Sequence, residues 1–116
     1  MSYDKLFKMD MKSIYDLYIQ KVQKKERLIS DVDIIIEWLT GYTKDDLNLL
    51  FSQGINVSDF FMKAPLLNPK RHLIKGIICG IRVEDIEDPL IQSIRYLDKL
   101  IDELARGKKI TSILRS

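Results

Sequence analysis

The sequence predicts an all-α protein, folded as a single compact bundle of about six helices. Three observations support this prediction. Apolar residues recur at spacings of three and four along most of the chain, residues that start and stop helices separate these stretches, and no stretch requires a sheet. The 116 residues are expected to form one domain, 1–116, large enough to bury a core without disulfides.

The composition is that of a soluble globular protein, with 46% hydrophobic and 31% charged residues. The 19 basic and 17 acidic residues give a net charge of +2, which is too close to balance to indicate a nucleic-acid or membrane partner by itself. Charges are scattered through the N-terminal residues, and the longest apolar run, 76–81, is too short to cross a bilayer. We therefore expect a cytoplasmic protein without a membrane partner.

An arm and a first helix are predicted at the N-terminus. Residues 3–9 alternate weakly in polarity, which indicates a short extended arm. Ser13 is expected to cap a helix that ends in the basic run at 24–27. The inward face of this helix is expected to hold Ile14, Tyr15, Tyr18 and Val22.

Two further helices are predicted from capping-box patterns. Ser30 with Asp33, and Thr43 with Asp46, place a hydroxyl three residues before a carboxylate, which is typical of a helix start. Gly41 is expected to end the first of these helices. The predicted inward residues are Val32, Ile35, Ile36 and Leu39 in the first helix, and Leu47, Leu50 and Phe51 in the second.

The middle of the chain predicts two more helical stretches. Ser58 is expected to cap one or two turns that stop at Pro65. Asn68 and Pro69 then form a cap followed by a proline at the first helical position, so we expect a helix that runs from there toward Gly80.

The longest helix is predicted at 89–106, after a helical turn at 83–87. Asp88 can cap its first amides, Pro89 suits its first position, and Gly107 is a natural stop. Such a helix would be roughly 27 Å long, about the width of a small domain. Its apolar stripe consists of Leu90, Ile94, Leu97, Ile101 and Leu104. The stripe is shorter than a coiled coil needs, so we expect it to pack inside the domain rather than against a second copy.

The outer face of this central helix predicts two ion pairs at a spacing of four, Lys99 with Glu103 and Asp102 with Arg106. Beyond Gly107, apolar residues at 110, 113 and 114 predict a final short helix folded back on the domain.

Several short motifs carry a resemblance to a known family. They are LNP at 67–69, GxxCGxRVE at 76–84, IEDPL at 86–90, IRYLDKL at 94–100, EWLTGY at 37–42 and DELAxGK at 102–108. In these motifs the chain resembles a small bacterial family catalogued as domain of unknown function 2200. The resemblance covers nearly the whole chain. It implies a bacterial, cytoplasmic, single-domain protein without an assigned activity, and it transfers no catalytic or ligand-binding residues.

Four carboxylates lie within five residues, at Glu84, Asp85, Glu87 and Asp88. A Mg²⁺ or Ca²⁺ site is one interpretation of this acidic cluster. The spacing matches no calcium loop, however, and no second acidic cluster completes an oxygen cage. We therefore expect these acids to stabilise a helix N-terminus, and we predict neither a metal nor any other cofactor.

The single histidine, His72, is the residue that any histidine-based catalysis would need. Its sequence neighbours Lys70, Arg71 and Lys75 are basic and supply no carboxylate to orient the ring. We therefore expect His72 to lie on a solvated helix surface.

Cys79 is the only cysteine, which excludes an intrachain disulfide. It lies in an apolar run, so it is expected to be a small core residue rather than a reactive thiol. Gly76 and Gly80, four residues apart, predict close packing of helices or a helix end.

A basic face at 63–75 offers candidate phosphate contacts, which are Lys63, Lys70, Arg71 and Lys75. The neighbouring helices around 41–43 have the order of a helix-turn-helix. Asp45 and Asp46, however, would place two carboxylates at the end that should meet the bases, so we expect a plain helical hairpin there.

No phosphate-binding glycine loop, paired-histidine metal motif or nucleophile elbow occurs in the sequence, which argues against an enzyme without excluding one. The leading hypothesis is a non-enzymatic interaction module that binds a protein partner or itself. The candidate surface consists of Asn68, Arg71, Arg82, Glu84, Asp88 and Arg95, with Tyr96 as an aromatic anchor. Two alternatives stay open: nucleic-acid binding through the basic face 63–75, and a small-ligand binder or enzyme with His72 or Cys79 in a pocket.

Overall fold

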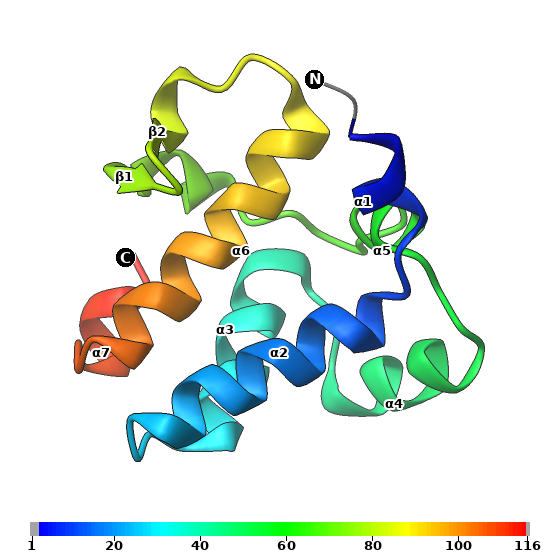
Figure 1. Ribbon diagram of the computed structural model, residues 1–116, viewed down its shortest axis with the longest axis horizontal. Coiled ribbons are helices and arrows are strands. Elements are labelled where there is room, and N and C mark those ends of the chain that lie inside the picture. The colour runs from blue at the N-terminus through cyan, green and yellow to red at the C-terminus, as the bar shows by residue number, and fades with distance from the viewer. Residues whose placement is uncertain (1–2, 116) are drawn as a thin grey trace.

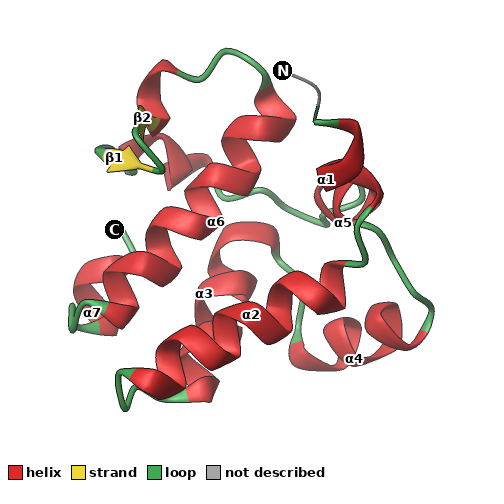
Figure 2. Ribbon diagram, viewed as in Figure 1, coloured by secondary structure: helices red, strands yellow, loops and turns green. Residues whose placement is uncertain are grey.

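The computed structural model describes residues 3–115 and confirms the all-α prediction (Figures 1 and 2). The α-helices are α1 (Asp4–Lys8), α2 (Met11–Lys24), α3 (Ile29–Thr40), α4 (Lys44–Ser52), α5 (Val57–Met62), α6 (Pro89–Ala105) and α7 (Ile110–Ile113). The two 3-10 turns are η1 (Pro69–Leu73) and η2 (Val83–Asp85), and the two short strands are β1 (Ile77–Ile78) and β2 (Ile81–Arg82).

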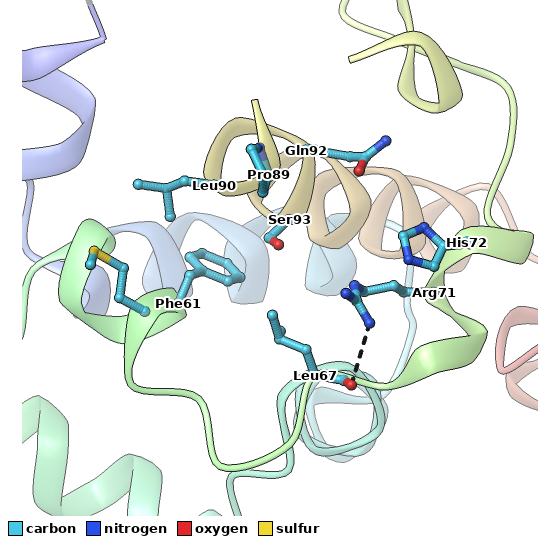
Figure 3. Close-up of a pocket in the computed structure, with 9 residues that line it drawn as sticks. Phe61, Leu67, Arg71, His72, Pro89, Leu90, Gln92 and Ser93 are labelled. Carbon is cyan, nitrogen blue, oxygen red and sulfur yellow. Dashed lines mark hydrogen bonds between the residues drawn. The ribbon is translucent and has the colours of Figure 1, made fainter. Parts of the chain in front are cut away.

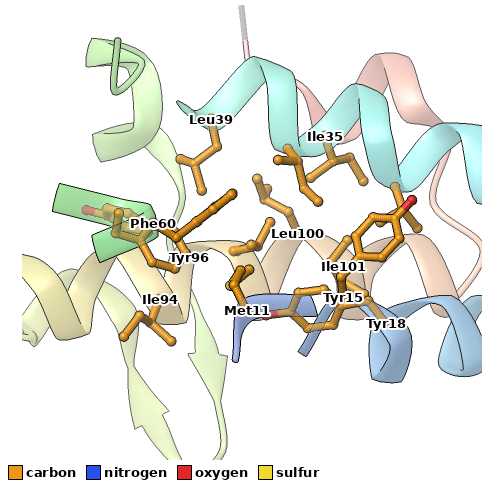
Figure 4. Packing of buried hydrophobic residues seen from close by; sticks show 14 of the residues in the cluster. Met11, Tyr15, Tyr18, Ile35, Leu39, Phe60, Ile94, Tyr96, Leu100 and Ile101 are labelled. Carbon is orange, nitrogen blue, oxygen red and sulfur yellow. The ribbon is translucent and has the colours of Figure 1, made fainter. Parts of the chain in front are cut away.

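The central helix is α6, as the sequence predicts. Asp88 caps it by accepting hydrogen bonds from the backbone N–H groups of Leu90 and Ile91, at 2.9 and 3.0 Å. Helices α2, α3, α5 and α7 all contact α6, which crosses the molecule diagonally in Figure 1. Its apolar stripe therefore packs inside the domain, with Leu100 and Ile101 facing residues such as Met11 and Ile35 (Figure 4).

The predicted turn between α3 and α4 is also confirmed. Gly41 ends α3 with a left-handed φ of 82°, which a glycine adopts without strain. Thr43 and Asp46 form the expected capping box, with the Asp46 N–H donating to Thr43 Oγ1 at 3.1 Å and the Thr43 N–H donating to Asp46 Oδ2 at 2.9 Å.

Three predicted helix starts are wrong by a few residues. Asp10, rather than Ser13, caps α2, because the inward face begins one turn earlier, at Met11, which is 1% exposed. Asn56, rather than Ser58, caps α5 by accepting from the Asp59 N–H at 2.7 Å. Ser30 and Asp33 form no capping box, since α3 begins at Ile29.

Two predictions of backbone class are wrong as well. The expected extended arm at 3–9 contains the helix α1, which packs against α5 and places Leu6 and Phe7 against the core. The helix expected from Asn68 toward Gly80 stops after the single turn η1, and the chain then forms the hairpin of β1 and β2.

The hairpin forms because the chain after η1 favours strands. Gly76 adopts a φ of 117°, which takes the backbone out of the helical region. The residues that follow are β-branched, and Ile78 pairs with Ile81 across a two-residue loop. That loop is Cys79-Gly80, whose φ values of 53° and 77° are both positive, as a type I′ turn requires. The small sheet is the part of the described chain that departs from the expected all-helical pattern.

Candidate functional site

The predicted interaction surface does not form one exposed patch, because several of its members have structural roles. Asn68 caps η1 through the Lys70 N–H at 2.9 Å and donates its amide to the Trp38 carbonyl at 3.1 Å. Glu84 accepts a hydrogen bond from the Gly76 N–H at 3.1 Å, which holds the hairpin to η2. Asp88 caps α6. Of the predicted set, Arg71 and Arg95 line pockets with apolar neighbours. Arg95 is paired with Asp98 in its pocket, at 3.0 Å, so Arg71 is the better candidate for binding a charged ligand.

Tyr96 is not an exposed anchor, and that part of the prediction is wrong. Its side chain is 2% exposed, because position 96 lies on the inward face of α6. Its hydroxyl lies 3.3 Å from His72 Nδ1, which joins η1 to α6. Burial raises the pKa of Tyr96 despite the opposing effect of the Arg71 charge, so the hydroxyl stays protonated at neutral pH.

A cavity of about 450 Å³ lies between α5, the segment 67–72 and the first turns of α6 (Figure 3). We call it the α5–α6 pocket. Its volume is within the range of small-ligand pockets. It is lined by Phe61, Met62, Leu67, Arg71, His72, Pro89, Leu90, Gln92 and Ser93.

The pocket has an apolar side and a polar side. Phe61 and Leu90 lie at one end, while Arg71 and His72 lie at the other (Figure 3). Met62, which follows Phe61 in the chain, also lines the pocket. The thioether of Met62 is flexible, and the residue is 72% exposed, so it forms an adaptable wall at the mouth. The lining contains no aspartate or glutamate. The pocket therefore combines a hydrocarbon surface with net positive charge.

Arg71 is held in place by the backbone rather than by a carboxylate. Its Nη1 donates to the carbonyl of Asn68 at 2.9 Å and to that of Leu67 at 3.4 Å. Across residues 3–115, no acidic side chain forms an ion pair with this guanidinium. Its charge is thus positioned at the pocket and left uncompensated.

Ser93 brings a hydroxyl to the middle of the pocket. The residue is 5% exposed, and its hydroxyl lies between the apolar and cationic ends (Figure 3). Within the described chain it makes no hydrogen bond, although helical serines often donate to a carbonyl one turn earlier. Gln92, beside it, uses its amide to donate to the Val83 carbonyl at 3.0 Å. Ser93 therefore offers an unused donor to a ligand.

Cys79 is exposed at the tip of the hairpin, so the expectation of a core cysteine is wrong. The hairpin turn, which the sequence analysis did not predict, carries it out to solvent. Its Sγ lies 3.9 Å from Arg95 Nη1, while the same guanidinium nitrogen pairs with Asp98 at 3.0 Å. Arg95 is therefore partly enclosed between α6 and the hairpin rather than presented on an open surface.

A second cavity, of about 570 Å³, lies beside the hairpin and α6. Its lining includes Arg82, Lys99 and Arg106, but acids neutralise part of this charge. Asp102 accepts from Arg106 at 2.8 Å, as predicted, and also from Lys21 at 3.1 Å. Lys99 donates to the carbonyl of Ile77 instead of forming the predicted pair with Glu103. Apart from Ile77 and Gly76, the residues that line this cavity are charged, and acids and bases are both among them.

The other candidate groups are dispersed. Lys63, Lys70 and Lys75 are exposed, whereas Arg71 turns inward, so the basic face is not continuous. No group of three or more potential metal ligands is found in residues 3–115. In the same part of the chain, no helix is long and apolar enough to cross a membrane.

Sequence reasoning identified Arg71 and His72 but missed the rest of the pocket. Phe61, Leu67, Leu90 and Ser93 come from three separate segments, and each alone has the spacing of an ordinary core or loop residue. The proline after Asp88 was a signal for where α6 begins, but it carried no information about what faces its first turn.

Taken together, the fold and the pocket define a small helical protein with a pocket of ligand size. The chain belongs to the family described as an uncharacterized protein conserved in bacteria, DUF2200, whose profile matches residues 5–115. The solved crystal structure of the uncharacterized protein SP1917 is similar to it, with 42% sequence identity, a TM-score of 0.92, and coverage of 98% of this chain and 93% of that one. No curated protein matches the chain.

Proposed function

We propose that this protein is a non-enzymatic interaction module of the bacterial cytoplasm, and that the α5–α6 pocket binds an acidic, apolar-containing segment of a partner protein. The observation that carries the proposal is the pairing, in one cavity, of an apolar wall with the uncompensated charge of Arg71. Its family is conserved in bacteria, and a free exposed cysteine is typical of proteins in a reducing compartment.

The surroundings of the pocket support a macromolecular partner. Met62 at the mouth and Leu66 nearby in the chain are 72% and 67% exposed, and exposed apolar residues next to a pocket are typical of interaction sites. Lys63 and Lys70 flank the pocket in sequence, are exposed, and form no ion pair with another described residue. These two lysines would attract an acidic segment during the encounter.

Site-specific photo-crosslinking in living cells tests this proposal. A photoreactive amino acid at Met62 should capture one protein, because this side chain lies at the mouth of the pocket. Leu17 on α2, which is 55% exposed and does not line the pocket, is the matched control. Adding Arg71→Gln to the Met62 probe should reduce the crosslink severalfold if the guanidinium binds the captured segment.

Two results would contradict the proposal. Equal capture at Met62 and Leu17 would show that the pocket is not the binding site. Material whose capture is lost on nuclease treatment, and whose affinity falls steeply with salt, would instead support nucleic-acid binding through the basic face 63–75.

A further inference from the structure

We infer that the segment bound in the α5–α6 pocket is the C-terminal end of a polypeptide that finishes in an apolar residue. Its free carboxylate would bind at Arg71 and Ser93, and its last side chain would pack against Phe61, Met62 and Leu90. This inference rests on the proposed function of the same pocket and adds the chemistry of the ligand.

The charge of the pocket favours a ligand with one negative charge. Arg71 carries the permanent positive charge among the lining residues, and no lining carboxylate opposes it. A carboxylate has one negative charge at neutral pH, whereas a phosphate monoester has between about 1.5 and 2. A guanidinium also binds the two oxygens of a carboxylate in a matching planar geometry.

Ser93 provides the second indication of a ligand at this place. The residue is 5% exposed as a whole, and its hydroxyl faces the pocket without a hydrogen-bond partner in the described chain, so it is free to donate to a ligand. A carboxylate oxygen would accept this hydrogen bond. Arg71 can offer only N–H donors, so both groups suit an acceptor that has several lone pairs.

The apolar wall of the pocket favours a C-terminal residue over an internal aspartate or glutamate as the ligand. Phe61, Met62 and Leu90 lie in the same cavity as Arg71, and that cavity has a volume of only about 450 Å³. An internal aspartate or glutamate would bring a carboxylate without an apolar group on the same residue. A C-terminal leucine, isoleucine, methionine or phenylalanine carries both on a single Cα, so it satisfies both sides of the pocket at once.

Calorimetric titration with short synthetic peptides tests the inference. The probe is the acetylated pentapeptide Gly-Ser-Gly-Ala-Leu with a free C-terminus, compared with the same peptide ending in a carboxamide. The free acid should bind at least about tenfold more tightly, since a hydrogen bond to a charged group is worth that much or more. A third peptide ending in glycine should bind as weakly as the carboxamide, because it leaves the apolar wall uncovered.

Variants locate the binding. Arg71→Gln should abolish the preference for the acid over the amide, and Arg71→Lys should restore part of it by returning the charge. Met62→Ser should weaken binding of the leucine-ended peptide severalfold while leaving the preference for the acid intact. Arg106→Gln, which removes an exposed arginine outside the pocket, is the matched control and should bind like the wild type. Thermal unfolding of each variant checks that it is folded.

The outcomes separate this inference from the proposed function. Equal binding of acid and amide, or no binding of either at millimolar concentration, would overturn the inference. The proposed function would survive that result if the Met62 probe captured an internal segment of a partner protein. Binding of N-acetylleucine as tightly as the pentapeptide would also overturn it, because the ligand would then be a small carboxylic acid and not a polypeptide end. Loss of Met62-specific capture would overturn the proposed function itself.

Discussion

Arg115 donates two hydrogen bonds to Glu103, from Nη1 to Oε1 at 2.7 Å and from Nη2 to Oε2 at 2.9 Å, and thereby fastens the C-terminal helix α7 to α6. Glu103 is 8% exposed, so this is a nearly buried, bidentate pair. The sequence places Glu103 on the outer face of α6 with Lys99 as its partner. Instead, the packing of α7 against α6 encloses the Glu103 carboxylate, and Arg115 is its partner.

Breaking this pair should destabilise the protein. We expect Arg115→Gln to lower the free energy of unfolding by about 2 kcal/mol at pH 7, because Glu103 would stay buried with the weaker Lys108 pair, at 3.6 Å, as its remaining ion pair among the described residues. Urea unfolding measures the change. A double-mutant cycle with Glu103→Gln is the control, and the two losses should not add if the pair acts as a unit.

The same pair predicts a pH dependence in acid. Burial raises the pKa of Glu103, but the Arg115 hydrogen bonds and the nearby positive charges outweigh it and lower the pKa overall. A folded-state pKa below the unfolded value stabilises the protein above about pH 4.3, and that stability is lost as the pH falls through the folded value. The difference between wild type and Arg115→Gln should therefore shrink in urea titrations below about pH 4. A difference that stays constant as the pH falls below that value would contradict the assigned role of Glu103.

Tyr18 should contribute stability that disappears in base. Its hydroxyl donates to Asp98 at 2.5 Å, linking α2 to α6. We expect Tyr18→Phe to cost about 1 kcal/mol at neutral pH. Burial, followed by the negative charge of Asp98, raises the pKa of Tyr18 well above its usual value. A raised folded-state pKa means that this contribution is complete below about pH 10 and is lost as the pH rises further. The cost of Tyr18→Phe should thus decrease as the pH rises above about 10, as measured by urea unfolding.

The hairpin turn should tolerate asparagine better than its natural cysteine. Cys79 adopts a φ of 53°, which is unfavourable for most side chains but common for asparagine. Asparagine followed by glycine is the preferred pair for a type I′ turn, so Cys79→Asn should stabilise the protein by about 0.5 kcal/mol. Cys79→Val, a β-branched control, should destabilise it. Thermal unfolding of the three proteins checks this order of stability. A wild-type protein at least as stable as Cys79→Asn would contradict the turn assignment.

Two glycines offer a matched test of close packing. Gly41 and Gly54 have similar positive φ values, 82° and 73°. A Cβ at Gly41 would lie 3.1 Å from the backbone nitrogen of Leu66, whereas a Cβ at Gly54 would meet nothing within 4 Å. Gly54→Ala should cost about 1 kcal/mol from backbone strain alone, and Gly41→Ala about 2 kcal/mol or more. Equal losses in urea unfolding would show that the segment around Leu66 moves aside freely.

Much of the helical architecture could be predicted because its signals are local. The cap at Asp88, the capping box of Thr43 with Asp46, and the left-handed stop at Gly41 each depend on residues within one turn. The apolar stripe of α6 also indicated its inward face, because residues three and four apart share one side of a helix. These predictions are confirmed since neighbouring residues alone determine them.

The hairpin was missed because local and tertiary preferences conflict there. Asn68-Pro69 starts a helical turn as predicted, but the run of β-branched residues after Gly76 favours strands. The hairpin is then held against the rest of the fold by contacts from outside it, including the Gly76 N–H to Glu84 and the Lys99 ammonium to the Ile77 carbonyl. The position of Cys79 in solvent follows from this turn.

The sequence by itself determined the all-helical class, the central helix and several helix boundaries, such as Thr43, Gly41 and Asp88, because caps, glycines and apolar periodicity act within one or two turns. Only the tertiary structure decided the α5–α6 pocket, the burial of Tyr96 and the pairing of Glu103 with Arg115. Each of these joins residues from different segments, and its energy depends on which faces meet when the chain folds. Periodicity shows that a face is apolar, but it does not show which face will lie opposite.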